Sequence, residues 1–370
     1  MSFNESIHTI LLNSNLDISV NWFALKQIGS DGMRTIAELE DFLTKPSSQL
    51  INDLKLVEGD ILILGVGGKM GPTLAKMTKR AIAQAGLDKK VIGVSRFSSG
   101  SLKEELEDFG IETIAVDLLN DEQLQSLPDV KNIILMAGNK FGTAGNEHFT
   151  WAMNAYLPGR IAEKFKNSRI VAFSSGNIYP LTNVVSGNCS EETAASPIGE
   201  YAQSCLGRER VLTNFSRNNE TPMLLFRLNY AIDMRYGVLV EIAQHVLEGN
   251  AIDLTMGSVN VIWQGDANEY AVRSLLHCDT PPKIVNVTGP ETISVRWLAE
   301  EFGMRFEKKP LFVNEEQPTA LLNNASKAHQ LFGYPKVTLQ QMIDMTAEWL
   351  THKGETYNKL THFQERKGAF

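Results

Sequence analysis

The feature that most constrains the fold of this 370-residue chain is a buried-strand pattern followed at once by a glycine-rich loop. Four aliphatic residues at 61–64 precede the segment GVGGKMGP, which covers positions 65–72. A short aliphatic run that ends at glycine is typical of a strand buried on both faces of a sheet, and proline is favoured in the first turn of a helix. The pattern therefore predicts a strand, a tight loop and a helix in direct succession.

The alternation of strands and helices continues beyond this loop. Apolar runs predict strands at 61–64, 91–95, 112–116, 132–136, 169–174 and 223–227, and helices are expected between them at 72–85, 102–108, 121–126 and 148–166. Strands separated by helices in this way form βαβ units with right-handed crossovers. The predicted fold class is therefore α/β, with a Rossmann-type doubly wound parallel sheet.

The remaining residues divide around this sheet. Two short helices, at 36–43 and 50–56, are predicted within an N-terminal helical extension that covers residues 1–58. The doubly wound domain is expected over 59–230, with a return segment at about 256–285. A smaller C-terminal substrate-binding subdomain is expected from 231–255 and 286–370, and its aromatic and basic tail at 361–367 either folds over a neighbouring subunit or frays.

Charge and cysteine content argue against several classes of function. The 35 basic and 43 acidic side chains give a net charge of -8, so no overall positive field attracts nucleic acid or anionic lipid. No apolar stretch reaches the roughly 20 residues of a membrane helix, and the N-terminus lacks the pattern of a secretory signal. Three widely spaced cysteines and seven histidines show no disulfide framework or metal-ligand spacing. We expect a cytoplasmic protein with no metal and no nucleic-acid or membrane partner.

The glycines of the loop predict a binding site for a dinucleotide. Gly65 permits the tight turn, Gly68 lets a pyrophosphate approach the backbone, and Gly71 allows the helix to pack closely on the strand. The free N–H groups at the start of the following helix, together with its dipole, form an anion site. A turn with a purely structural role is the alternative interpretation.

The GxxGxxG spacing resembles that of the short-chain dehydrogenase/reductase superfamily, which implies NAD or NADP as the cofactor. Ser95 stands where NAD-preferring members carry an acidic residue, and Arg96 can pair with a 2′-phosphate, so that NADP is slightly favoured. The resemblance implies these cofactor-binding residues: Gly65, Gly67, Gly68, Lys69, Met70, Gly71, Ser95, Arg96, Asp117, Leu118, Ala137, Gly138, Asn139 and Asn229.

The segment SSGNIY at 174–179 resembles the SSxxxVYG segment of the extended branch of this superfamily, the nucleotide-sugar epimerases and dehydratases. The resemblance gives Ser175 the role of polarising the reacting oxygen and Tyr201 the role of transferring its proton. Asn154 matches an asparagine that the family keeps in a helix. Family members carry a lysine four residues after the tyrosine, whereas this chain has Cys205.

The missing lysine matters because a free tyrosine, with a pKa near ~10, is a poor base at neutral pH. A unit charge about 4 Å from the phenol is worth ~4 kcal/mol at an effective dielectric of ~20, or roughly 3 pKa units. Lys140, in a stretch that resembles the AGLK of UDP-galactose epimerases, is the favoured replacement, and Arg208 is the other candidate. Cys205 is either a buried apolar side chain or a reactive thiol.

The residues predicted to contact substrate are Asn177, Arg235, Trp263 and Gln264. Arg235 would pair with a carboxylate, or alternatively lie in solvent. Trp263 would stack on a sugar ring, or alternatively pack in the core. Nucleotide-sugar enzymes of this kind carry an arginine seven residues before the position of Asp266, and Val259 stands there in this chain. The missing phosphate contact favours a substrate that is not a nucleotide sugar.

These observations predict an NAD(P)-dependent oxidoreductase or epimerase that acts on a hydroxyl or ketone of a sugar or sugar derivative by hydride transfer. Dehydration is disfavoured because no acidic pair follows Ser175. The resemblance also implies a homodimer, since extended members often pair through two helices from each subunit. Two alternatives stay open: a catalytically silent NAD(P)-binding or sensing protein, and a nucleotide-sugar epimerase.

Overall fold

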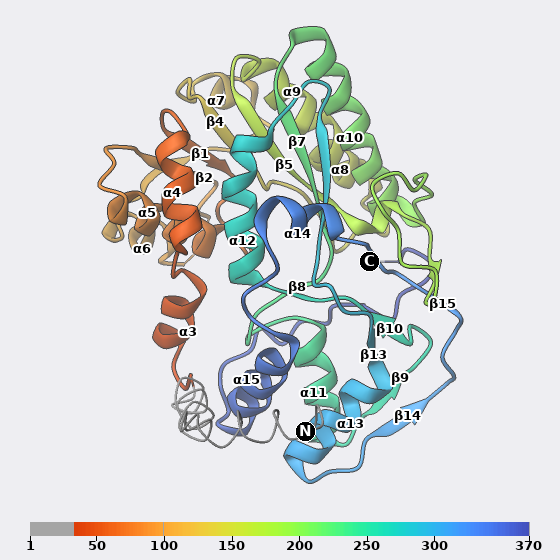
Figure 1. Cartoon of the computed structure of the whole chain (residues 1–370). Coiled ribbons are helices and arrows are strands. Elements are labelled where there is room, and N and C mark those ends of the chain that lie inside the picture. The colour runs from red at the N-terminus through yellow and green to blue at the C-terminus, as the bar shows by residue number, and fades with distance from the viewer. Residues whose placement is uncertain (1–32, 99, 370) are drawn as a thin grey trace, which may run out of the picture.

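A seven-stranded parallel sheet lies at the centre of one lobe of the molecule, the upper lobe in Figure 1. The computed structural model describes residues 33–98 and 100–369. The strands of the sheet are β1 (Ile61–Leu64), β2 (Val91–Ser95), β3 (Glu112–Ala115), β4 (Asn132–Leu135), β5 (Arg169–Ser175), β7 (Met223–Leu228) and β12 (Lys283–Val287). Their order is β3-β2-β1-β4-β5-β7-β12. The order reverses between β1 and β4, and ligands of doubly wound sheets bind in the crevice at such a reversal.

Helices cover both faces of this sheet. They are α5 (Gly71–Gln84), α6 (Leu102–Asp108), α7 (Asp121–Gln125), α8 (Glu147–Trp151), α9 (Leu157–Lys164), α10 (Gly199–Asn219), α12 (Gln264–Arg273) and α14 (Ser326–Phe332), with 3-10 turns η2 (Gly176–Ile178) and η3 (Ser274–His277). On one face Leu74 of α5 and Ala267 of α12 belong to the same buried cluster. On the other face Ile161 of α9 packs with Leu212 of α10. The Rossmann-type doubly wound fold is therefore confirmed.

The two N-terminal helices bridge the lobes of the molecule. The α3 helix (Ile36–Leu43) is capped by Thr35, and α4 (Ser48–Leu56) is capped by Ser47. Leu39 and Leu43 of α3 are buried in the core of the lower lobe, whereas α4 packs on α5 and α12 of the upper lobe. The part of the expected extension at 1–32 lies outside the described residues.

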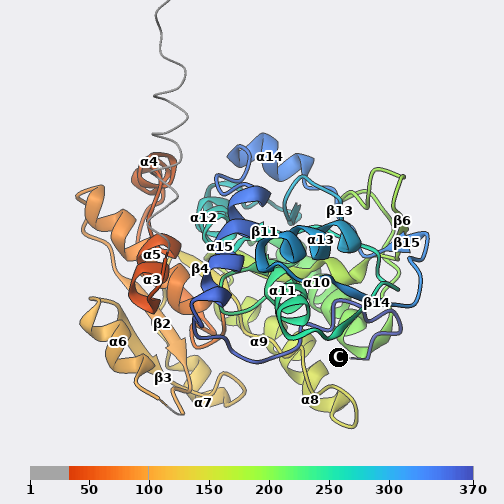
Figure 2. The same ribbon diagram turned by 90° about the horizontal axis from the view of Figure 1, so that it is seen from below.

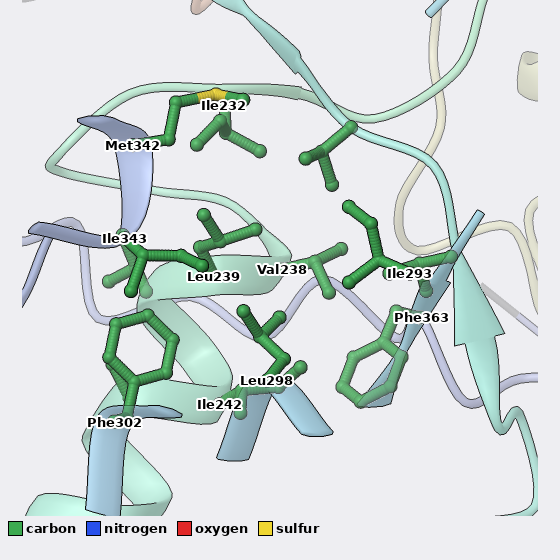
Figure 3. Packing of buried hydrophobic residues seen from close by; sticks show 14 of the residues in the cluster. Ile232, Val238, Leu239, Ile242, Ile293, Leu298, Phe302, Met342, Ile343 and Phe363 are labelled. Atoms are coloured by element: carbon green, nitrogen blue, oxygen red, sulfur yellow. The ribbon is translucent and has the colours of Figure 1, made fainter. Parts of the chain in front are cut away.

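The lower lobe is built from three helices around an aliphatic core. These helices are α11 (Val238–Glu248), α13 (Val295–Phe306) and α15 (Leu339–Thr351), which Figure 2 shows side by side from below. Short paired strands surround them: β6 (Thr182–Asn183), β8 (Ala231–Ile232), β9 (Ala251–Asp253), β10 (Ser258–Val259), β11 (Ile262–Trp263), β13 (Ile293–Ser294), β14 (Leu311–Val313) and β15 (Thr319–Ala320). Figure 3 shows Leu239 and Ile242 of α11 near Phe302 of α13 and Ile343 of α15. The burial of such side chains stabilises the lobe, at roughly 25 cal/mol per Å² of apolar surface.

The C-terminal tail, residues 352–369, packs along its own chain. Phe363 is buried in the core of the lower lobe, where Figure 3 shows it beside Ile293. Arg366 donates hydrogen bonds to the carbonyl oxygen of Thr319 at 2.7 Å and to its hydroxyl at 2.6 Å. Near its end the tail reaches Gly199, where an added Cβ would lie 2.3 Å from the carbonyl oxygen of Gly368. The tail therefore ties the lower lobe to the first residue of α10.

Two parts of the structure differ from the sequence-based prediction. The helix expected at 148–166 contains a π-helical turn, η1 (Ala152–Tyr156), between α8 and α9. The expected return segment is split, because Met256 and Trp263 are buried in the lower core while α12 and β12 belong to the upper lobe. Among the described residues, no helix is both long and apolar enough to cross a membrane.

Candidate functional site

The glycine-rich loop connects β1 to α5 at the reversal of strand order. Gly65 has a φ of +91°, and an added Cβ would lie 2.6 Å from the backbone nitrogen of Ala137. At Gly71 an added Cβ would lie 2.2 Å from the carbonyl oxygen of Val66. At Gly68 the nearest atom to such a Cβ is 3.4 Å away. The first two positions require glycine for packing, whereas Gly68 leaves the backbone open to a ligand.

The outer end of the loop lies against the end of β2. An added Cβ at Gly67 would be 2.5 Å from the hydroxyl oxygen of Ser95, and Arg96 follows as an exposed side chain. Asp117, after β3, accepts a hydrogen bond from the backbone nitrogen of Leu119 at 3.0 Å. These residues lie at the carboxyl edge of the sheet, where a doubly wound fold binds its ligand.

A cavity of about 310 Å³ opens beside the loop. Its walls also come from the segments that follow β4, β5 and β7. The predicted residues that line it are Gly65, Gly68, Lys69, Met70, Gly138, Asn139, Lys140, Asn154, Ser175, Asn177, Tyr201 and Asn229. Among the predicted residues, those outside its lining are Gly67, Gly71, Ser95, Arg96, Asp117, Leu118, Ala137, Cys205, Arg235, Trp263 and Gln264. Most of the predicted catalytic residues therefore meet at one cavity.

Tyr201 and Ser175 meet in this cavity from different elements. Ser175 is the last residue of β5, and Tyr201 lies in the first turn of α10. Their side chains share a hydrogen bond, which favours the ionised phenol, while burial raises the pKa of Tyr201. In this environment the phenol needs a nearby cation before it can lose its own proton and act as a base at neutral pH.

Lys140 lies next to the tyrosine. Its Nζ is 5.9 Å from the centroid of the Tyr201 ring and 5.2 Å from that of Phe141. Burial lowers the pKa of Lys140 to about 8, so the side chain is still mostly charged at neutral pH. A cation at this distance favours the ionised phenol.

Asn154 holds the loop after β4 in place. Its Oδ1 accepts a hydrogen bond from the backbone nitrogen of Asn139 at 2.8 Å, and its Nδ2 donates to the carbonyl oxygen of the same residue at 2.7 Å. Asn154 lies within the π-helical turn, and such turns occur frequently at functional sites. The turn gives this carboxamide its position beneath Gly138 and Asn139.

Arg208 fixes Asn154 from the side of α10. Its guanidinium group donates to the carbonyl oxygen of Asn154 at 3.0 Å, to its Oδ1 at 2.9 Å, and to the carbonyl oxygen of Phe173. An added Cβ at Gly138 would lie 2.6 Å from this group. The spacing in α10 placed Arg208 two turns from Tyr201, yet the residue also lines the cavity.

Cys205 stands one helical turn after Tyr201, but it is a buried thiol. Only 1% of its surface is exposed, and it packs with Ile178, Tyr179 and Cys189. Burial raises the pKa of the Cys205 thiol, which keeps it protonated and unreactive. This environment corresponds to the apolar alternative for Cys205.

Three residues predicted to contact substrate, Arg235, Trp263 and Gln264, lie outside the lining of this cavity. Arg235 folds back on Asp233 at 3.0 Å and contacts Glu40 at 3.5 Å. Its guanidinium group also lies 5.3 Å from the centroid of the Tyr357 ring. These two acids already neutralise the side chain, so Arg235 is not placed to receive a substrate carboxylate.

Trp263 and Gln264 face the N-terminal half of the chain. The Trp263 ring lies 5.5 Å from that of Phe42 on α3, at a second cavity of about 340 Å³. Gln264 is fully buried and donates to the hydroxyl of Thr73 on α5 at 3.1 Å. Neither side chain lines the first cavity.

Sequence reasoning missed two aspects of the site. Thr361 of the tail lines the cavity, and its backbone nitrogen donates to the buried carboxylate of Glu241 at 2.7 Å. Tyr236 lines it as well, next to Lys69. Neither position belongs to a motif, because both reach the site only through the packing of the lower lobe. Among the described residues, no cluster of three or more histidine, cysteine or acidic side chains is arranged to hold a metal ion.

The fold and the cavity together define a class of architecture: a Rossmann-type doubly wound sheet with a cavity beside the reversal of its strand order. Comparison of the sequence with protein-family models and with curated proteins gives no match. Comparison of the structure with solved structures shows the shared fold. UDP-glucuronic acid 4-epimerase from Bacillus cereus, in complex with UDP-glucuronic acid and NAD, superposes with a TM-score of 0.64 at 16% identity over 80% of this chain and 99% of that chain.

Two further solved structures agree with this assignment of the fold. UDP-glucose 4-epimerase from Thermus thermophilus, in complex with NAD, gives a TM-score of 0.63 at 18% identity over 78% of this chain and 98% of that one. dTDP-glucose 4,6-dehydratase from Bacillus anthracis, in complex with NAD, gives a TM-score of 0.65 at 18% identity over 80% of this chain and 97% of that one. The chain therefore has the fold of NAD-dependent sugar-nucleotide epimerases and dehydratases.

Proposed function

We propose that this protein is an NAD(P)-dependent oxidoreductase or epimerase that acts on a hydroxyl or ketone of a sugar or sugar derivative. The observation that carries the proposal is the meeting of Tyr201, Ser175 and Lys140 in one cavity beside the open glycine loop. A nicotinamide cofactor at this loop would accept or return a hydride at the substrate carbon.

The residues around the loop fit such a cofactor. Gly68 leaves the backbone open, and the amino terminus of α5, where the helix dipole favours an anion, follows the loop directly. Asn229 lines the cavity, and its side-chain nitrogen is buried without a hydrogen-bond partner among the described residues. A buried donor of this kind is costly unless a ligand accepts from it. Arg96, exposed at the end of β2, favours NADP slightly over NAD.

The chain's own groups would handle the proton of the reacting hydroxyl. Ser175 donates a hydrogen bond to the substrate oxygen, and Tyr201 takes the proton during oxidation and returns it during reduction. Lys140 favours the ionised phenol from the side of the loop after β4. Arg208 and Asn154 keep that loop in position and do not themselves contact the reacting atoms.

The substrate we propose is not a nucleotide sugar. Where the related nucleotide-sugar enzymes are expected to carry an arginine for the diphosphate, Val259 is fully buried and pairs with Ile293 across two short strands. No guanidinium group is available at that position. The named neighbours act on nucleotide sugars, so a nucleotide-sugar epimerase is the second candidate. The expected homodimer and cytoplasmic location stay predictions.

The test incubates the purified protein with NAD⁺ or NADP⁺ and with free sugars, sugar acids and UDP-sugars. Absorbance of the reduced nicotinamide detects oxidation, and product chromatography detects epimers when the cofactor is regenerated. Tyr201→Phe should lose turnover by at least about a thousandfold while it still binds the cofactor. Tyr334→Phe, which alters an exposed tyrosine, is the matched control.

Two outcomes would contradict the proposal. Full turnover by Tyr201→Phe would remove the tyrosine from the mechanism. Cofactor binding without turnover of any sugar in the panel would favour the silent NAD(P)-binding protein that Cys205 suggests.

A further inference from the structure

The C-terminal tail forms part of the wall of the substrate cavity. Thr361 lines the cavity and is only 3% exposed. Its backbone nitrogen donates a hydrogen bond to the carboxylate of Glu241 on α11 at 2.7 Å, and Glu241 is itself buried. A buried carboxylate is costly unless it accepts hydrogen bonds. The wall at Thr361 is therefore held in place by a specific contact with the lower lobe.

The two residues after Thr361 in the tail contact other parts of the cavity wall. The carbonyl oxygen of Phe363 accepts a hydrogen bond from the hydroxyl of Tyr230 at 3.5 Å. The His362 ring lies 6.0 Å from the ring of Phe141. Tyr230 follows β7, Phe141 lies in the loop after β4, and both line the cavity. The tail therefore joins two loops that follow strands of the central sheet.

Further along, the tail bounds a small pocket next to Asn177. This pocket has a volume of about 30 Å³, and its lining includes Glu365, Arg366 and Gly368. Asn177 lines both the small pocket and the cavity. An added Cβ at Gly199, the first residue of α10, would lie 2.3 Å from the carbonyl oxygen of Gly368. The tail thus packs closely against the start of the helix that carries the catalytic tyrosine.

The cavity behind this wall is small. Its volume is about 310 Å³, at the lower end of the roughly 300–1,000 Å³ that small-molecule sites occupy. Gly65, Gly68 and Gly138 are among its lining residues, so the nicotinamide end of a cofactor would share this volume with the substrate. The remaining room suits a single sugar ring better than a sugar that carries a nucleotide.

We propose that the tail segment 361–368 selects the substrate by size and limits it to one sugar ring. The inference rests on the proposed function and assigns its substrate preference to a segment that belongs to no motif. It is separate from the argument made on Val259. The absence of an arginine at that position removes an attraction for a diphosphate, whereas the tail would exclude any group that extends the sugar, charged or neutral. A neutral disaccharide distinguishes the two arguments.

The test uses series of ligands that share one sugar ring and differ in what is attached to it. Isothermal titration calorimetry at pH 7 with saturating NAD⁺ compares D-galactose with lactose and UDP-galactose, and D-glucose with maltose and UDP-glucose. At least one monosaccharide should bind at least about tenfold more tightly than both of its extended forms. The disaccharides are the decisive ligands, because they add length without charge.

Two tail variants test the wall directly. Arg366→Ala removes the hydrogen bonds to Thr319 and should loosen the segment, so that the preference for the monosaccharide over the disaccharide falls at least about tenfold. Thr361→Leu adds bulk to the wall and should weaken monosaccharide binding at least about tenfold. Both variants should keep the NAD⁺ affinity within about threefold of the wild-type value. Arg296→Ala and Thr351→Leu, which lie outside the cavity lining, are the matched controls and should change neither affinity.

Thermal melts establish which variants are folded, and the wild-type ligand series tests the inference even where a variant fails to fold. Several results would overturn it. These are wild-type binding of a disaccharide or a UDP-sugar as tight as that of its monosaccharide, no binding of any monosaccharide, or unchanged selectivity in folded Arg366→Ala. A loss of NAD⁺ affinity in Thr361→Leu as large as its loss of monosaccharide affinity would also overturn it.

Turnover separates this inference from the function on which it rests. Oxidation or epimerisation of a disaccharide as fast as that of its monosaccharide would overturn the inference and leave the proposed function intact. Selective binding of a monosaccharide without any turnover would support the inference and contradict the proposed function.

Discussion

Replacing Lys140 with methionine removes a positive charge whose nitrogen lies 5.9 Å from the centroid of the Tyr201 ring. At an effective dielectric of ~20, a unit charge at this distance is worth about 3 kcal/mol, or roughly 2 pKa units of the phenol. The charge favours the phenolate, so its loss raises further the pKa of Tyr201, which burial already raises. We expect kcat/KM for substrate oxidation to fall about 100-fold at pH 7.

The size of this loss should depend on pH. Burial lowers the pKa of Lys140 to about 8, so the wild-type enzyme carries the charge below that pH and loses it above. The two profiles of kcat/KM against pH, followed by the absorbance of the reduced nicotinamide, should therefore converge above pH 8. Lys140→Arg keeps the charge and should keep the wild-type profile. Lys131→Met, exposed at the other end of β4, is the control. Superimposable wild-type and Lys140→Met profiles, or equal losses in the arginine and methionine variants, would refute the reasoning.

Three further perturbations test other parts of the structure. Gly71→Ala would place a Cβ 2.2 Å from the carbonyl oxygen of Val66. A fluorescence titration should then show at least tenfold weaker cofactor binding, and urea unfolding should show that the free energy of unfolding falls by about 1–3 kcal/mol. Unchanged affinity and stability would contradict the close packing at this glycine. Lys69→Met should raise stability at pH 7 by up to about 3 kcal/mol, because burial lowers the pKa of this lysine to about 8. This gain in stability should shrink as pH rises above 8, because the folded wild-type protein then releases the lysine proton that its unfolded chain still binds. A gain in stability that does not depend on pH would contradict this cause. Phe363→Ala should lower the free energy of unfolding in urea by about 3–5 kcal/mol. It should also weaken substrate binding more than cofactor binding, because the tail carries Thr361 into the cavity wall. Equal weakening of substrate and cofactor binding would contradict this role of the tail.

Much of the upper lobe could be predicted from the sequence because its signals are local. The aliphatic run at 61–64 and the glycines at 65, 68 and 71 define a strand, a loop and a helix within a few residues. The π-helical turn at Ala152–Tyr156 was not predicted, because its residues keep the apolar pattern of an uninterrupted helix. The lower lobe was predicted only as a region, since its strands of two or three residues are too short to leave a periodic pattern.

The site could be predicted where a motif fixes both the residue and its direction. Ser175 and Tyr201 end or begin long elements, and their side chains meet in the cavity. Trp263 ends a strand of two residues and Arg235 follows another, so their directions depend on neighbours that the sequence does not identify. Trp263 turns to Phe42 and Arg235 to Asp233. Lys69 was assigned to the cofactor because it belongs to the loop, although its side chain reaches the lower lobe.

The wall of the cavity is assembled from residues as far apart in the sequence as Gly65 and Thr361. Contacts of such long sequence separation form late in folding, because the entropy of closing the intervening chain has to be overcome first. The strands of the doubly wound sheet all lie before residue 288, but the wall of the substrate cavity is complete only once the tail has docked on Glu241 and Gly199. A folding intermediate of this protein is therefore expected to bind its cofactor before it gains the ability to select a substrate.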